Sequence, residues 1–142
     1  MHIHITADTP LSEIQRVFSQ FYPFLKIEFF SKRHKKYEGS TEDNQIDPGI
    51  LVGDIKHNHA PGMLEVKPLY KVFDVEREFQ QHFGLSVQIF RKEKEDWQQS
   101  TGTDDFTLKE LNELGKDSSD EYILDDYEEG LEEPEEKPEK LF

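Results

Sequence analysis

Histidine is the residue type with the clearest chemical capacity in this chain, because its imidazole binds transition metals and titrates near neutral pH. The six histidines include two His-x-His pairs, His2 with His4 and His57 with His59. Residues two apart on a strand point to one face, so each pair could bring two imidazoles to one metal ion. His34 or the other pair would complete such a site. The alternative is a solvent-facing strand edge and a polar loop, because no cysteine assists and no His-Glu-x-x-His motif is present.

Carboxylates are too numerous in this chain to indicate catalysis by themselves. Among 31 acidic residues, neighbours such as Asp104 and Asp105 arise readily, and their position just before an expected helix suits the helix dipole. The chain has no Gly-rich phosphate loop, no Gly-x-Ser-x-Gly elbow and no paired nucleophile and base. We therefore expect no catalytic residues and no cofactor.

A short basic run stands out in an otherwise acidic chain. Residues 31–39 read SKRHKKYEG and contain the four cations Lys32, Arg33, Lys35 and Lys36, although the formal net charge of the whole chain is -14. The run could bind nucleic acid, receive an acidic segment of the same chain, or form a solvated turn. Nucleic-acid-binding domains usually have a high pI, whereas the pI here is about 4.8. Direct contact with nucleic acid is therefore not expected.

The excess negative charge lies near the C-terminus. Residues 117–142 contain 12 acids and 2 lysines (2 − 12 = −10), and residues 1–116 contain 19 acids and 15 bases (15 − 19 = −4). Like charges repel, so disorder is expected for 117–142. Apolar and aromatic residues within it are typical of a segment that binds a partner, and the candidates are Tyr122, Ile123, Leu124, Tyr127 and Phe142. The alternative is a solubilising tail.

Periodicity predicts the elements that must position these residues within one α+β domain, residues 1–116. Apolar residues at helical spacing predict helices over 10–21 and 72–83, with Thr9 as the N-cap of the first and Gly84 ending the second. Thr107 and Glu110 form a capping box for a third helix that Gly115 would end. A long loop with one short element is expected over 31–62. Strands are expected over 2–6, 24–30, 63–68, 85–92 and 96–101.

The two strand–helix–strand units resemble each other. In an alignment with one gap, Leu11, Ile14, Phe18 and Leu25 match Val72, Val75, Phe79 and Leu85. Two β-α-β units in series favour a ferredoxin-like (split βαβ) sandwich. The alternative is that any two amphipathic units of this kind align equally well.

Three stretches, FLKIEFF, HFGLSVQIFRK and TDDFTLKELN, resemble a family of small uncharacterised proteins from Bacteroidetes-type bacteria. The resemblance implies a bacterial protein and supplies no activity, cofactor or site residue. The N-terminus lacks the basic and apolar regions of a signal peptide, and no apolar run is long enough to span a membrane. We expect a cytoplasmic protein without membrane contact, either a monomer or a weak homodimer.

These observations together predict a non-enzymatic protein–protein interaction module. Its acidic tail would contact a basic partner surface or the chain's own basic run. Two alternatives stay open: a small metal-binding or enzymatic domain that uses the His-x-His pairs, and a nucleic-acid-binding domain that uses residues 32–36.

Overall fold

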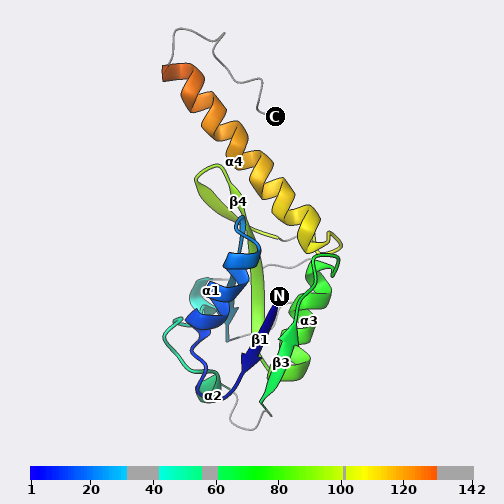
Figure 1. Ribbon diagram of the computed structural model, residues 1–142. Coiled ribbons are helices and arrows are strands. Elements are labelled where there is room, and N and C mark those ends of the chain that lie inside the picture. Colours follow the sequence, from blue (N-terminus) through cyan, green and yellow to red (C-terminus); the bar gives the residue numbers. More distant parts are fainter. Residues whose placement is uncertain (32–41, 56–60, 101, 131–142) are drawn as a thin grey trace.

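The computed structural model describes residues 1–31, 42–55, 61–100 and 102–130, and the side chains of these residues up to 119. The described chain begins with a strand–helix–strand unit, and a second such unit follows after two short helices (Figure 1). Their bounds, in chain order, are β1 (His2–Ile5), α1 (Leu11–Phe21), β2 (Leu25–Phe30), the short 3₁₀ helix η1 (Glu42–Asn44), α2 (Val52–Ile55), β3 (Gly62–Glu65), α3 (Val72–Phe83), β4 (Ser86–Glu93), β5 (Asp96–Gln99) and α4 (Leu108–Gly130).

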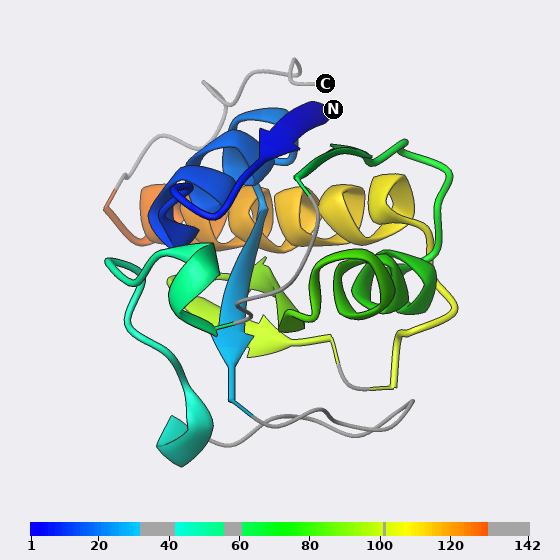
Figure 2. The ribbon, with the colours of Figure 1, turned by 90° about the horizontal axis from the view of Figure 1, so that it is seen from below.

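The strands form two antiparallel sheets. One pairs β1 with β3, and the other has the strand order β2-β4-β5. Figure 1 shows α1 and α3 on either side of the strands, and Figure 2 shows α4 crossing the molecule behind them. The α+β class predicted from the sequence is confirmed. A ferredoxin-like arrangement is not confirmed, because the described strands divide between two sheets, and it stays a prediction.

Helix α1 begins without the side-chain cap that the sequence suggests. The N-cap position is Pro10, and Thr9 Oγ1 instead accepts a hydrogen bond from Thr6 N (2.9 Å). The first amide of α1, Leu11 N, donates to Ile50 O (3.0 Å). The Ile50 carbonyl therefore satisfies the first amide of α1, although no side-chain cap is present. The α3 helix ends at Gly84 as predicted, in the left-handed conformation (φ 65°) that glycine adopts without steric cost.

The internal repeat expected from the sequence is present in the backbone hydrogen bonds and extends beyond the aligned residues. Leu11 N donates to Ile50 O, and its equivalent Val72 N donates to Phe106 O (2.9 Å). Three further pairs of equivalent bonds join a backbone N–H to a backbone carbonyl. Ser12 N donates to Pro48 O as Phe73 N donates to Asp104 O, and Val52 N donates to Thr9 O as Leu108 N donates to Tyr70 O. Gly53 N donates to Ala7 O as Lys109 N donates to Pro68 O. Each repeat therefore extends to the start of a later helix, α2 in the first repeat and α4 in the second.

The two repeats are related by an approximate two-fold axis. The alignment that pairs Leu11 with Val72 also pairs Ile3 with Leu64, and these two residues lie directly opposite each other in the β1–β3 ladder. Glu28 and Gln88 are likewise equivalent and face each other in the β2–β4 ladder. Equivalent residues meet only where a two-fold axis passes, so the axis crosses both sheets. The helices α1 and α3 bury their apolar faces in a single core between them.

Helix α4 corrects the prediction that Gly115 ends the third helix. The helix continues to Gly130, and Gly115 serves close packing instead. A Cβ atom at this position would lie 2.9 Å from Phe24 O and 3.0 Å from Phe24 Cβ. Beyond Gly115 the helix stays attached to the domain, because Lys94 N donates to Ser118 Oγ (3.3 Å). The disorder expected for 117–142 is not confirmed, since 117–130 are helical and 131–142 lie outside the described residues.

In the part of the chain that the structure describes, no helix combines the length and the apolar character needed to cross a membrane.

Candidate interaction groove

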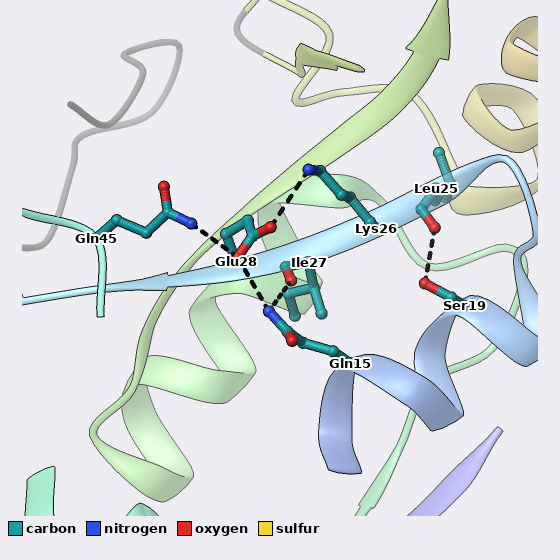
Figure 3. Close-up of polar contacts among 7 residues, drawn as sticks. All are labelled: Gln15, Ser19, Leu25, Lys26, Ile27, Glu28 and Gln45. Atoms are coloured by element: carbon teal, nitrogen blue, oxygen red, sulfur yellow. Dashed lines mark hydrogen bonds and ion pairs between the residues drawn. The ribbon is translucent and has the colours of Figure 1, made fainter. Parts of the chain in front are cut away.

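An open groove of about 400 Å³ lies between α1 and strand β2. It is formed by one polar face of α1, the middle of β2 and a single side chain of β5, and Figure 3 shows its polar contacts. Its lining residues are Ser12, Gln15, Arg16, Ser19, Lys26, Ile27, Glu28 and Trp97. The lining offers hydroxyl, amide, guanidinium, ammonium and indole donors, and one carboxylate.

Two α1 side chains cover the outer edge of β2. Ser19 Oγ donates to Leu25 O (3.1 Å), and Gln15 Nε2 donates to Ile27 O (2.9 Å) (Figure 3). Strand β2 is an edge strand of its sheet, and its outward carbonyls would otherwise invite pairing with another chain. This part of the groove therefore has a structural role in protecting the sheet.

The Glu28 carboxylate is surrounded by donors. Its Oε1 accepts hydrogen bonds from Gln15 Nε2 and Gln45 Nε2, each at 3.0 Å, and its Oε2 lies 3.3 Å from Lys26 Nζ (Figure 3). The side chain is only 14% exposed. The three donors around the Glu28 carboxylate fix the positions of their own side chains. A general base needs an oxygen within hydrogen-bond reach of a substrate proton, and here both oxygens already contact donors of the protein.

The aromatic wall of the groove is approached by two lysines. Lys26 Nζ lies 5.2 Å from the ring centroids of both Phe90 and Trp97, and Lys92 Nζ lies 5.0 Å from the Trp97 centroid. Cation–π contacts of this length are worth about 0.5–1 kcal/mol at exposed sites. Two ammonium groups thus converge on Trp97, the single tryptophan of the chain.

The groove can accept an anionic group at two points. The Arg16 guanidinium is paired with Glu13 across one helical turn (2.7 Å), in an exposed ion pair of the kind that adds little stability. An incoming carboxylate could therefore take the place of Glu13. Lys92 adds a second cation beside the aromatic wall. Anion binding next to an aromatic ring is the chemistry that this groove supports.

A second polar cluster lies in the other repeat and is closed to solvent. Glu76, Gln88, Ser100 and Asp104 are all buried. Glu76 Oε2 accepts a hydrogen bond from Ile89 N (3.2 Å), and Gln88 Nε2 donates to Ser100 Oγ (3.1 Å). Burial raises the pKa of the Glu76 carboxyl well above its ordinary value, and the nearby Asp104 carboxylate raises it further.

The two polar clusters are equivalent by the internal repeat. Gln15 on α1 corresponds to Glu76 on α3, and Glu28 on β2 corresponds to Gln88 on β4. Acid and amide have thus exchanged places between the repeats. Sequence reasoning missed Glu76, although a signal was present: Val72, Val75, Glu76 and Phe79 share one helical face, where an acid is out of place.

The structure describes two of the four predicted metal ligands, His2 and His4. His2 and His4 lie on the exposed face of β1, where His2 Nε2 is 3.0 Å from Glu65 Oε2 on β3 and His4 faces Met63. His57 and His59 lie outside the described residues. Within the described ranges, no three His, Cys, Asp or Glu side chains gather in a way that could hold a metal ion.

The predicted partner-binding residues are only partly covered by the structure. The four cations of the basic run lie outside the described residues, as does Phe142; these cations are Lys32, Arg33, Lys35 and Lys36. Tyr122, Ile123, Leu124 and Tyr127 belong to the last turns of α4. Sequence reasoning did not identify the α1 groove, because its residues come from three separate elements and only the fold brings them together.

Comparison of the chain with protein-family models, with curated proteins and with solved structures finds no match.

Proposed function

We propose that this protein is a non-enzymatic protein–protein interaction module whose acidic C-terminal region contacts a basic partner surface. The observation that supports the proposal is helix α4, which carries the acidic residues outward from the domain on a regular scaffold (Figure 1). We further infer that the protein acts in the cytoplasm of a bacterium, in keeping with its resemblance to small proteins of Bacteroidetes type.

The charge of α4 is concentrated in its outer part. Residues 117–130 contain seven acids and no lysine or arginine. A helix rises about 1.5 Å per residue, so the eleven positions from 120 to 130 extend it by roughly 16 Å. Figure 1 shows these last turns reaching past the β4–β5 hairpin. A run of like charges at the end of a helix favours electrostatic steering toward a basic surface.

The contacts of α4 with the domain support a role of this helix in holding its acidic residues toward a partner. Leu108 and Leu111 are fully buried, and Gly115 lets the helix backbone approach Phe24 closely. These contacts fix the direction in which the helix leaves the domain. A helix that served only to keep the protein soluble would not need so close a contact.

The proposal is tested in the full chain with a variant, called the charge-neutral α4 variant, in which positions 120–130 of α4 carry no charge. Asp and Glu at positions 120, 121, 125, 126, 128 and 129 are replaced by Asn and Gln. Proteins captured from the native lysate by the wild type are identified and purified, and their affinities for both chains are measured by calorimetry. Exposed ion pairs contribute about 0.2–1 kcal/mol each, so losing six of them costs at least about 1.2 kcal/mol and weakens binding by roughly sevenfold or more.

A control variant neutralises Asp74 and Glu78 on α3, whose side chains are 43% and 40% exposed. The control variant should bind the purified partner with unchanged affinity. Equal binding by the wild type and the charge-neutral α4 variant would refute the proposal.

A further inference from the structure

We propose that the groove between α1 and β2 is a docking site, within the same molecule, for residues 131–142. The inference deepens the proposed function and rests on it, because it takes the acidic C-terminal region as the contact element of the protein. The segment would occupy the groove until a partner with a stronger basic surface displaces it.

Charge complementarity is the first argument. Residues 131–142 contain five glutamates and two lysines, a net charge of −3 (2 − 5). The groove and its rim offer Arg16, Lys26 and Lys92. Arg16 and Lys26 already hold carboxylates of the domain, Glu13 at 2.7 Å and Glu28 at 3.3 Å. The groove is therefore built from groups that bind carboxylates, and an acidic segment supplies more of them.

The aromatic wall is the second argument. Trp97 and Phe90 line the groove or its rim, and both rings are only partly covered. The segment contains three large apolar residues, Leu131, Leu141 and Phe142. The five glutamates lie between Leu131 and the pair Leu141–Phe142, so the segment offers both carboxylates and apolar side chains to a site where ammonium groups lie next to aromatic rings.

Position and reach are the third argument. In both views of the molecule, the end of α4 at Gly130 lies on the side that carries α1 and the β4–β5 hairpin (Figures 1 and 2). The segment that follows could span up to about 40 Å when extended. A tethered segment has an effective concentration in the millimolar range, so even a weak site would be substantially occupied.

Paramagnetic relaxation in the full chain tests the proposal directly. The chain contains no cysteine, so a nitroxide on Lys140→Cys labels a single position. At about 0.1 M salt, docking should broaden the indole N–H signal of Trp97 and the amide signals of Ser12 and Ser19. Raising the salt to about 1 M shortens the screening length from ~10 Å to ~3 Å, and the broadening should disappear.

Variants of the groove provide the matched comparison. Lys26→Gln or Lys92→Gln should each lower the docking equilibrium constant by about 2- to 5-fold, and both together by roughly tenfold. Lys109→Gln removes an exposed lysine of α4 outside the groove and should leave the broadening unchanged.

Two results would overturn the inference. One is the absence of broadening at Trp97 at low salt. The other is broadening that also occurs when the spin label and the observed nuclei are on different molecules, which would place the segment in the groove of a second copy. Binding of the purified partner to the charge-neutral α4 variant is measured separately, so the proposed function can stand or fall independently of this docking site.

Discussion

Replacing Glu76 by Gln should make the protein more stable, and the gain should grow as the pH rises. Glu76 is 6% exposed and lies beside the buried Asp104. Burial and the Asp104 carboxylate raise its pKa well above the ordinary value of 4.5. The acid therefore keeps its proton in the folded state over a pH range in which it is already ionised in the unfolded chain.

The sign and the size of the effect follow from proton linkage. Between pH 4.5 and the folded-state pKa, the folded protein binds more protons than the unfolded chain. The free energy of unfolding therefore falls with rising pH, by up to about 1.4 kcal/mol for each pH unit in this window. Stability from this group is fully present below pH 4.5 and is lost as the pH rises through the folded-state pKa.

Glu76→Gln removes this pH dependence and keeps the fold. The Gln side chain retains an oxygen that can accept the hydrogen bond from Ile89 N. The other repeat already carries an amide at the equivalent position, Gln15. We expect similar stabilities for the two proteins near pH 4.5 and a growing advantage of the variant toward pH 8.

Urea unfolding followed by circular dichroism at several pH values measures the difference. Glu78→Gln, on the same helix and 40% exposed, is the control and should follow the wild type. Glu13 and Glu110 have lowered pKa values through hydrogen bonds with Arg16 and Thr107 respectively, and both are present in all three proteins. Parallel stability curves for the wild type and Glu76→Gln would refute the reasoning.

Substitutions at three further positions test the local structure by urea unfolding. Gly115→Ala should lower the free energy of unfolding by about 1–3 kcal/mol, because its Cβ would lie 2.9 Å from Phe24 O. This loss should outweigh the higher helix propensity of alanine. A variant more stable than the wild type would contradict the close packing of α4. Thr107→Ala removes the hydroxyl that accepts from Glu110 N (3.1 Å) and should cost about 0.5–2 kcal/mol, whereas Thr107→Ser should cost much less. Lys94→Gly relieves a left-handed backbone (φ 56°) and should raise stability by up to about 1 kcal/mol; a loss would show that the hairpin turn is unstrained.

The elements of the fold were largely predictable because their local signals agree. Apolar periodicity indicated α1 and α3, and alternation indicated the strands that flank them. Gly84 was correctly expected to end α3, and Thr107 with Glu110 forms the predicted capping box. Each of these features depends on residues that are close together in the sequence.

Features that depend on tertiary contacts were not predictable in the same way. Gly115 has the same local context as a helix-ending glycine, and only its approach to Phe24 explains why α4 continues. The loops around Ile50 and Phe106 share a hydrogen-bond pattern but little sequence, because backbone groups make the bonds. The groove combines residues of α1, β2 and β5, so no linear pattern reveals it.

The approximate two-fold axis has a consequence for the origin of the chain. The β1–β3 and β2–β4 ladders both join one repeat to the other, so a single repeat on its own would leave both ladders without a partner. Two identical copies related by an exact two-fold axis would satisfy them, in the way that symmetric homodimers do. In such a dimer every substitution appears twice. Joining the copies into one chain allows each position to change alone. An ancestral site shared by both halves could then become an open groove around Glu28 in one repeat and a buried polar cluster around Glu76 in the other.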